Sequence, residues 1–477
     1  MCCNTKCWLI AGSVIGGLLA ILGGILIPVG DIVIKGEIDK EAVIEEGTIA
    51  YDNWIVPGSS VYRQFWIYQV LNPDDIINGG KPKLQQKGPY TYLVRYAPKY
   101  NVTQNNNNTV TFYQPNVAAF QRDMSIGPDS DTYTVLNLAV AAAPGMISNV
   151  FLSIVNQAIK SSNSSLFQTR SVKEVLWGYR DPFLEQIPDF IIKDKMTGVF
   201  YPYNETNDGP YVVYNGKDDI SKVAKITRYN RESTLSYWND DYCDMINGTD
   251  AASFPPFVDK NAPLYFFSSE ICRSIYAVFE KEYTLEGIKL SRFVLPKFAL
   301  ASPYDNPDNH CFCKDQLISR NCNASGVLDL RACQGGKPIF LSLPHFLYAS
   351  EFLLESLDGL SPNVEEHQTY VDVEPTTGFT MHFAKRLQVN VYFNRTSKID
   401  VLSNLLSEFM FPVVWLNETA TIGKDKANEF KSSVTTPMNA LGIIQIVFIC
   451  LGIVLFLSCS ITLCVRSRKE RRNGKKV

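Results

Sequence analysis

The stretch WLIAGSVIGGLLAILGGILIPV, residues 8–29, determines how the rest of the chain is organised. It contains no charged residue, and as an α-helix it is about 33 Å long, which is enough to cross a bilayer. A cleaved secretory signal is the alternative at an N-terminus, but such signals have shorter apolar cores and small-residue cleavage sites. We therefore expect an uncleaved transmembrane helix over residues 8–29. Gly12, Gly16, Ala20 and Gly24 share one face of it, which favours close packing against another helix over a lipid-facing stripe.

A second uncharged stretch covers residues 440–465 and is followed by a strongly basic tail, residues 466–477. The positive-inside rule places this tail in the cytoplasm, and two crossings return residues 1–7 to the same side. We therefore expect residues 30–439 to form one ectodomain, outside the cell or in a lumen.

The charge balance excludes a general nucleic-acid binder. The whole chain has a formal net charge of −3, the basic tail carries +6 and Lys6 +1, which leaves about −10 for the 409 residues from Asp31 to Asn439. A segment of this length can bury a large core, and we find no linker or internal repeat that would divide it.

Glycosylation sequons agree with this topology, because all eight lie between the two apolar stretches. The acceptor asparagines are Asn101, Asn107, Asn163, Asn204, Asn247, Asn323, Asn394 and Asn417.

The cysteines divide in the same way. Six of the twelve lie within residues 243–333, and in an oxidising compartment they predict three disulfides with fifteen possible connectivities. Zinc is the competing interpretation because Cys311-Phe-Cys313 follows His310, but C-x-C is not a usual structural zinc spacing. We expect no metal and no cofactor.

The middle of the chain predicts an antiparallel β core with inserted helices. Residues 61–70, 90–96 and 110–113 are aromatic and β-branched runs between Asn, Gly and Pro turns, which is typical of strands. Residues 370–374 and 379–393 predict a hairpin, with apolar residues alternating at positions 387, 389, 391 and 393.

Residues 132–159 are uncharged and mainly apolar, but Pro144-Gly145 divides them into two pieces that are too short to span a membrane. We expect a helical hairpin over residues 134–143 and 146–160. In the second helix an i, i+4 stripe includes Val150, Phe151, Ile154 and Val155. Packing of this stripe on the core is the simpler interpretation, and docking of a lipid or partner is the other.

The sequence contains no convincing catalytic constellation. It has no G-x-S-x-G elbow, H-E-x-x-H pair, Walker A loop or strand-linked G-x-G-x-x-G, and its four histidines show no metal spacing. We therefore expect a protein that is not an enzyme.

Seven blocks make the chain resemble the class B scavenger receptor family along nearly its whole length. They are residues 23–31 (GGILIPVGD), 45–50 (EEGTIA), 61–67 (VYRQFWI), 177–183 (WGYRDPF), 243–257 (CDMINGTDAASFPPF), 306–313 (NPDNHCFC) and 342–350 (SLPHFLYAS).

This resemblance implies an α+β membrane protein anchored by two transmembrane helices. Its large ectodomain would have an antiparallel β-barrel-like core, an apolar tunnel and an apical helical bundle. The implied function is that of a receptor and transporter that mediates uptake and signalling. The implied ligands are long-chain fatty acids, native and oxidised lipoproteins and anionic phospholipids. Thrombospondin-like proteins and cytoplasmic Src-family kinases are the implied protein partners. The implied location is the plasma membrane, with lipid rafts and the Golgi as further sites.

The resemblance also assigns cysteine roles. It implies the disulfides Cys243–Cys311, Cys272–Cys333 and Cys313–Cys322, and palmitoylation of Cys3, Cys7 and Cys464, which lie near the membrane.

Two departures from the family pattern bear on the ligands. The resemblance implies lysines after the second apical helix, where this chain has Ser161 and Asn163, so that Lys160 is the nearest cation. We expect Val150, Phe151, Ile154, Val155 and Lys160 to form the ligand entrance. The acidic thrombospondin-binding segment is replaced by Asn105–Asn108.

Two other functions share this topology. A ligand-gated channel would need a polar helix face, which residues 440–465 lack. A lysosomal receptor for a hydrolase should carry a leucine-based sorting signal, and residues 466–477 contain no leucine. A surface receptor is therefore the favoured interpretation.

Overall fold

A computed structural model describes residues 5–314, 322–406 and 408–473. The chain forms two compact units. The helical unit comprises residues 1–41, 286–288 and 423–477, and the β-rich unit comprises residues 42–285 and 289–422.

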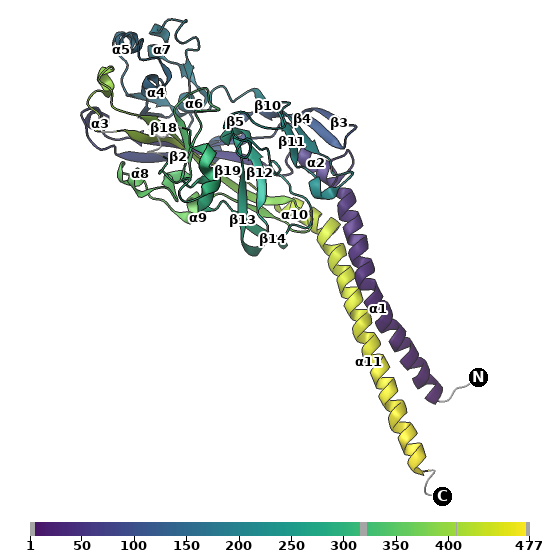
Figure 1. The fold of residues 1–477 in the computed structure, drawn as a ribbon. Coiled ribbons are helices and arrows are strands. Elements are labelled where there is room, and N and C mark those ends of the chain that lie inside the picture. The colour runs from purple at the N-terminus through teal and green to yellow at the C-terminus, as the bar shows by residue number, and fades with distance from the viewer. Residues whose placement is uncertain (1–4, 315–321, 407, 474–477) are drawn as a thin grey trace. The chain divides into compact units, whose positions relative to one another are not determined.

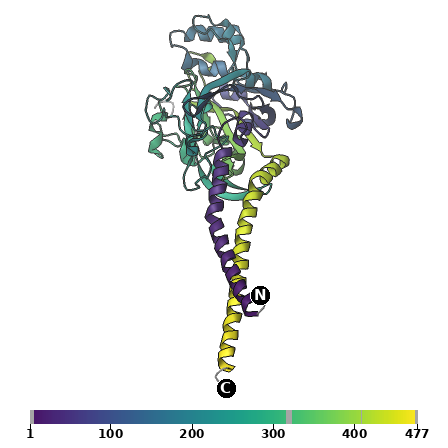
Figure 2. The same ribbon diagram turned by 90° about the vertical axis from the view of Figure 1, so that its right-hand side faces the viewer.

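Two long helices make up most of the helical unit. They are α1 (Thr5–Glu41) and α11 (Thr436–Asn473), which run side by side (Figures 1 and 2). The short helix α10 (Lys424–Phe430) and a π-helical turn (Lys431–Thr435) precede α11. Both long helices continue beyond the uncharged stretches, and α1 passes through Pro28. Both are long and apolar enough to cross a membrane.

Small residues form the contact between α1 and α11. A Cβ atom added to Gly16 would lie 2.5 Å from the backbone nitrogen of Phe456, and one added to Gly452 would lie 2.4 Å from the backbone nitrogen of Ala20. A Cβ on Gly24 would meet no atom within 4 Å. The predicted small-residue stripe therefore packs against the second helix at Gly16 and Ala20, but Gly24 lies off this contact.

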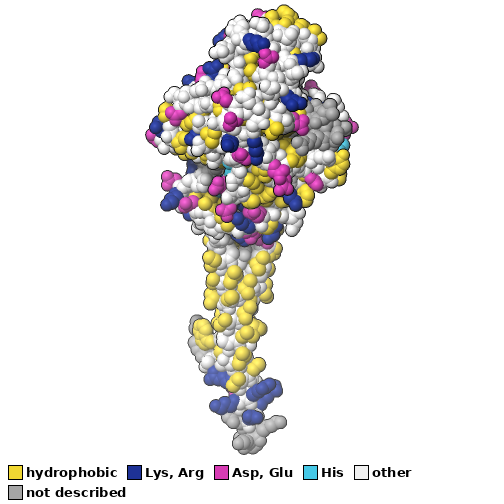
Figure 3. Space-filling model, turned by 90° about the vertical axis from the view of Figure 1, so that its left-hand side faces the viewer, with side chains coloured by type: hydrophobic (Ala, Val, Ile, Leu, Met, Phe, Trp, Pro, Cys, Tyr) yellow, Lys and Arg dark blue, Asp and Glu magenta, His cyan; other side chains and the backbone are white. Residues whose placement is uncertain are grey.

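Polar side chains of α11 hydrogen-bond to α1 or to their own helix. The Nε2 of Gln445 donates to the carbonyl oxygen of Leu26 at 2.8 Å, and the hydroxyls of Ser13 and Ser460 are 3.1 Å apart. Figure 3 shows hydrophobic side chains over the visible surface of the two helices, followed by Lys and Arg side chains towards the C-terminus. The pair thus presents an apolar surface over most of its length, as an anchor requires.

The β-rich unit is built on one large sheet of eleven strands. The order is β12-β13-β14-β17-β18-β19-β1-β2-β5, and β15 and β16 join through β18. Its strands are β1 (Val61–Val70), β2 (Leu84–Val94), β5 (Ala118–Phe120), β12 (Leu264–Ser268), β13 (Arg273–Leu285), β14 (Ile288–Val294), β15 (Val327–Asp329), β16 (Ile339–Ser342), β17 (Tyr370–Val373), β18 (Thr380–Phe393) and β19 (Phe409–Thr421).

Smaller sheets surround it. A four-stranded sheet has the order β11-β10-β4-β3, and β6-β7 and β8-β9 are two-stranded. The strands are β3 (Tyr100–Asn105), β4 (Thr109–Asn116), β6 (Thr132–Leu136), β7 (Phe167–Ser171), β8 (Tyr179–Arg180), β9 (Met196–Thr197), β10 (Thr206–Tyr214) and β11 (Ile226–Tyr229).

Short helices lie between the strands. The α-helices are α2 (Ile49–Ile55), α3 (Pro73–Ile77), α4 (Leu138–Met146), α5 (Leu152–Ser161), α6 (Val172–Trp177), α7 (Pro182–Gln186), α8 (Glu351–Glu355) and α9 (Val364–His367). The 3₁₀ turns cover Arg122–Met124, Ile220–Lys222, Ser269–Ile271, Lys297–Leu300, Pro307–Phe312, Pro344–Phe346 and Asp400–Leu402.

The predicted antiparallel β core with inserted helices is confirmed. The structure has β1 at residues 61–70 as predicted, and β17 and β18 form the predicted hairpin, in which Tyr370 pairs with Ala384. β1 and β19 also pair antiparallel, with Phe65 opposite Leu416. Their inward side chains join the main hydrophobic core.

The predicted helical hairpin needs two corrections. Residues 134–136, predicted as helix, belong to β6, which pairs with β7 and places Leu136 opposite Phe167. Asn137 then caps α4 by accepting a hydrogen bond from the backbone N–H of Val140 at 3.2 Å. The second helix begins at Leu152 rather than at Met146, so Val150 precedes it.

Candidate functional site

Helix α5 has one face in the main core. Leu152, Val155, Ala158 and Ile159 are buried there and recur at helical spacing. Val155 is fully buried, with an exposed fraction of 0%, as the interpretation of the stripe as core packing expects, whereas Val150 is exposed. The buried half of the predicted stripe therefore holds the helix in place.

The other half of the stripe is open to solvent. Val150 is 78% exposed, Met146 45% and Ile154 38%. Phe190, which follows α7, is 77% exposed, and its ring meets that of the half-buried Phe151 edge to face with centroids 6.1 Å apart. We call these five residues the α5 apolar patch. Figure 3 shows hydrophobic side chains gathered at the end of the β-rich unit that carries α5 and α7 in Figure 1.

Phe151 and Phe190 are in ring contact, and Val150 and Ile154 lie on either side of Phe151 in the chain. Single exposed apolar side chains are common on soluble surfaces, whereas a contiguous group is typical of a surface that binds a lipid, a ligand or a protein. Phe190 was missed by the sequence analysis, because it comes from another segment and lies within no periodic pattern.

Lys160, predicted as the cation at the ligand entrance, already has a counter-charge. Its ammonium lies 2.5 Å from Oδ2 of Asp400, and the amide of Asn156 donates to Oδ1 of the same carboxylate at 3.0 Å. The hydrogen bond from Lys160, followed by that from Asn156, holds the pKa of Asp400 below its usual value. Lys398 donates to the side-chain oxygen of Asn149 at 3.2 Å. These contacts join α5 and the turn before it to residues 398–400.

Arg170 and Lys173 are two other cations that follow α5 in the chain. Arg170 stacks over the ring of Tyr179 at 4.1 Å and lies 3.8 Å from Glu174. Lys173 is exposed, and among the described residues it has no carboxylate partner. Lys173 is therefore more available to an anion than Lys160 or Arg170.

A buried ion network lies inside the large sheet. Arg63 donates through Nε to Glu418 at 2.6 Å and through Nη2 to Glu270 at 2.9 Å. Arg95 binds the other oxygen of Glu418 at 2.9 Å, and Lys385 pairs with Glu270. Burial raises the pKa of Glu418, but Arg63 and Arg95 outweigh this effect and keep it below its usual value. The network joins β1, β18 and β19 to the residue that follows β2 and to the turn Ser269–Ile271.

Three disulfides occur in the β-rich unit, between Cys243 and Cys311, Cys272 and Cys333, and Cys313 and Cys322. Asp240, His310 and Cys311 have donor atoms close enough to suggest a metal site. They do not fit one, because Cys311 is bonded to Cys243 and offers no thiolate.

Most of the predicted glycosylation and palmitoylation sites that lie in the described residues are exposed. Seven of the eight sequon asparagines are exposed, whereas Asn417 is half-buried in β19 and donates to Gln64 at 3.1 Å. Cys7 and Cys464 are exposed on α1 and α11. Cys3 lies outside the described residues.

Comparison with known proteins gives a consistent result. The sequence pattern of the CD36 family matches residues 14–463. Lysosome membrane protein 2 of Homo sapiens is 37% identical over 408 residues, which cover 84% of this chain and 83% of the relative. Scavenger receptor class B member 1 of Cricetulus griseus is 31% identical over 459 residues, covering 94% and 88%. The Bos taurus protein of that name is 31% identical over 451 residues, covering 93% and 87%.

These relatives agree with the architecture. They are named as a receptor and a membrane protein rather than as enzymes, which fits the lack of catalytic motifs in the sequence. Together with the two terminal apolar helices, they identify a two-span membrane protein. The match covers both helices and the β-rich unit, so this chain belongs to the CD36 family, the class B scavenger receptors.

Proposed function

We propose that this protein is a lipid-binding receptor whose ligands first bind at the α5 apolar patch. The observation that carries the proposal is that Val150 and Phe190 are exposed beside Phe151. The opposite face of α5 is packed in the core, so the helix is held firmly in place. Each buried methylene contributes about 0.8 kcal/mol, so a sixteen-carbon acyl chain can be held chiefly by apolar contact.

The ligand class follows from the same surface. Long-chain fatty acids, native and oxidised lipoproteins and anionic phospholipids all present acyl chains beside a negative group. A carboxylate or phosphate must keep its hydration or meet a cation, because unpaired burial is costly. Lys173 is exposed and Lys160 is shared with Asp400, so we propose that the anionic group stays at the hydrated rim while the acyl chain enters an apolar tunnel.

Uptake of labelled oleate, normalised to the amount of protein at the surface, tests this proposal. Phe151→Glu and Val150→Glu place a carboxylate in the patch and should reduce uptake strongly, and more than Lys160→Ala does. Leu71→Glu is the matched control, because Leu71 is 54% exposed but belongs to another part of the β-rich unit. Normal uptake by both patch variants would place the entrance elsewhere.

We propose the topology with both termini in the cytoplasm, an ectodomain over residues 30–439 and spans over residues 8–29 and 440–465. Glycosidase should then remove many glycans, and a C-terminal tag should stain only in permeabilised cells. Tag staining on intact cells would contradict it. Palmitoylation of Cys3, Cys7 and Cys464 and contact of the tail with Src-family kinases belong to the same proposal. Asn105–Asn108 weaken the case for a thrombospondin-like partner.

A second candidate is a lysosomal receptor that binds a hydrolase. The observation that favours it is the 37% identity to a relative named lysosome membrane protein 2. Surface biotinylation combined with staining for a lysosomal marker separates the two locations. A protein found almost entirely in lysosomes, which captures a lumenal hydrolase through the α5 apolar patch, would favour this candidate over surface uptake.

A further inference from the structure

A small pocket of the β-rich unit, remote in sequence from α5, contains a buried arginine without a counter-charge. Arg273 begins β13 and is 6% exposed, and it lines the pocket together with Ser302, Asn309 and Phe312. The pocket offers about 30 Å³ to the centres of water-sized groups, two to three times what one water needs.

The guanidinium group has few good acceptors. Its Nε donates to the carbonyl oxygen of Ser274 at 3.1 Å, but its two Nη atoms reach only Ala299 O at 3.5 Å and Asn309 Oδ1 at 3.4 Å. A guanidinium has five N–H donors, so at least two have no acceptor in the described part of the chain. No described carboxylate pairs with Arg273, in contrast to Arg63, which binds Glu418 and Glu270.

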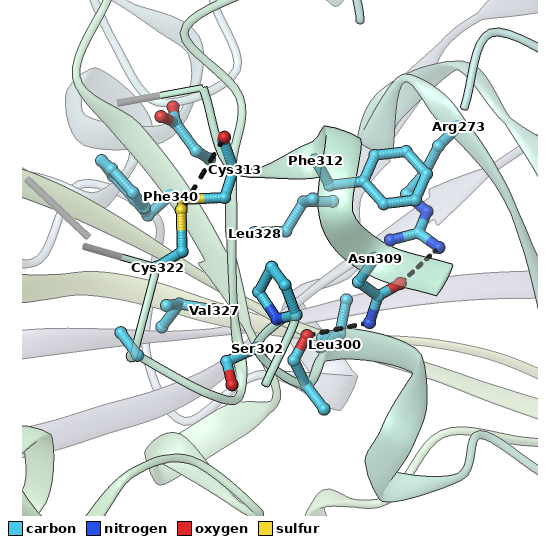
Figure 4. Close-up of a pocket in the computed structure, with 14 residues that line it drawn as sticks. Arg273, Leu300, Ser302, Asn309, Phe312, Cys313, Cys322, Val327, Leu328 and Phe340 are labelled. Atoms are coloured by element: carbon cyan, nitrogen blue, oxygen red, sulfur yellow. Dashed lines mark hydrogen bonds between the residues drawn. A yellow bond between two sulfur atoms is a disulfide. The ribbon is translucent and has the colours of Figure 1, made fainter. Parts of the chain in front are cut away.

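The neighbours hold Arg273 in position but do not neutralise it. The guanidinium carbon lies 3.4 Å from the centre of the Phe312 ring. The Asn309 amide nitrogen is already used by the carbonyl oxygens of Phe298 and Ala301 at 3.0 and 2.8 Å. Figure 4 shows Arg273 beside Phe312 and Asn309, with the Cys313–Cys322 disulfide on the other side of the pocket. The rest of the lining is largely apolar but includes Asp329, whose carboxylate is paired with Arg331 at 2.6 Å.

Such a charge is costly to bury alone. Burial lowers the pKa of Arg273 to about 9, which only the weak influence of Tyr242 and Tyr276 opposes. A bound anion would restore the balance, since an arginine that lies in a small, partly apolar site is well suited to a charge-assisted hydrogen bond.

We propose that this pocket binds a compact monovalent anion at Arg273, of the class that includes halides and short carboxylates. The anion could come from the surrounding fluid as chloride, or as the carboxylate of a side chain or chain terminus of a bound protein. The small volume of the pocket and its single cation, Arg273, favour a small anion over a lipid headgroup.

Thermal unfolding of the full-length protein in detergent tests the proposal, with sodium bromide or sodium acetate exchanged for sodium gluconate at constant ionic strength. Gluconate is too large for the pocket. Bromide or acetate should raise the unfolding temperature saturably, by about 1–3 °C. A rise with bromide alone identifies a halide site, and a rise with acetate alone identifies a carboxylate site. No rise above gluconate with either salt would overturn the proposal.

Two variants make the result specific. Arg273→Gln removes the cation and should abolish the difference between the salts. Ala301→Asp keeps Arg273 but supplies a carboxylate from a half-buried residue that lines the pocket, and should also abolish the difference between the salts. Because Ala301→Asp leaves Arg273 in place, it tests the proposal even if Arg273→Gln fails to fold. Crystals grown in bromide should show an anomalous peak beside the Arg273 guanidinium. An undiminished salt difference in Ala301→Asp, or a bromide peak absent from this pocket in crystals despite bromide stabilisation, would contradict the assignment.

Discussion

The imidazole rings of His345 and His367 stack in the β-rich unit, with centroids 4.4 Å apart and an angle of 8° between their planes. Nδ1 of each ring accepts a backbone N–H, from Ser361 at 3.0 Å and from Asn363 at 2.9 Å. Both side chains are buried. The arrangement suits two neutral rings, since protonation would place two positive charges face to face.

This pair predicts a loss of stability in acid. Burial, and then the charge of His367, lowers the pKa of His345 to about 4, and burial followed by Arg386 lowers that of His367 to about 4. The unfolded rings titrate near 6.5, so between pH 6.5 and 4 the unfolded chain binds more protons. The free energy of unfolding should therefore fall as the pH decreases through this range, by about 1–3 kcal/mol for each ring.

Denaturant unfolding of the purified protein between pH 7.5 and 4 measures this dependence. His367→Gln removes one of the two buried rings and should flatten the slope. An equal slope in wild type and His367→Gln would contradict the role of the pair.

The Arg63–Glu418 pair predicts an asymmetric mutational result. Arg63→Met leaves Glu418 and Glu270 facing each other with less positive charge, and should lower the free energy of unfolding by about 3–5 kcal/mol. The double variant Arg63→Met/Glu418→Met removes the stranded carboxylate and should be more stable than Arg63→Met alone. Denaturant midpoints and surface expression provide the measurements. A double variant less stable than the single one would mean that the buried charges do not dominate.

Strand β18 shows which part of this core was predictable. Alternation correctly predicts that Val389 points into the core, because successive side chains of a strand point to opposite faces of the sheet. Gln388 and Asn390, between the apolar positions, are also fully buried. The side chain of Gln388 accepts a hydrogen bond from the hydroxyl of Tyr68 at 2.7 Å, and Asn390 donates to Ser342 at 3.0 Å. These partners are distant in sequence, and no local pattern shows them.

The α5 apolar patch, like strand β18, could be predicted only in part from the sequence. Periodicity places an apolar helix near residue 150 and correctly includes Val150 and Phe151 in an apolar group. It could not show where the first helix of the hairpin, α4, begins, because the pairing of β6 with β7 makes residues 132–136 a strand. Asp400 and Phe190 complete the site from segments that fold against α5, and chain contacts of this kind need tertiary structure.

The contact between α1 and α11 predicts a sharp difference between two glycines. Gly16→Leu would place atoms on the Phe456 and Gly452 backbones and should separate the helices, whereas Gly24→Leu meets no atom within 4 Å. The Ser13 and Ser460 hydroxyls are 3.1 Å apart, so Ser13→Cys/Ser460→Cys should form a disulfide on mild oxidation.

Cross-linking is best measured with the other membrane-proximal cysteines changed to serine. Cyanogen bromide cuts after Met124 and Met438, so a bond between the helices joins fragments 2–124 and 439–477. Gly16→Leu should reduce the joined product severalfold, and Gly24→Leu should leave it unchanged. Equal cross-linking in both variants would contradict the arrangement of the pair.

The final prediction concerns the charge beside the α5 apolar patch. Because Asp400 neutralises Lys160, Asp400→Asn should leave a free ammonium near the acyl-binding surface while retaining a side chain that can still bond to Asn156. Exposed ion pairs contribute up to about 1 kcal/mol, so oleate uptake should rise by less than about fivefold. The gain should shrink at higher ionic strength, because exposed charges are screened. The double variant Lys160→Ala/Asp400→Asn is the control, and it should lose the gain in oleate uptake. A gain that persists without Lys160 would show that Asp400 itself repels the ligand.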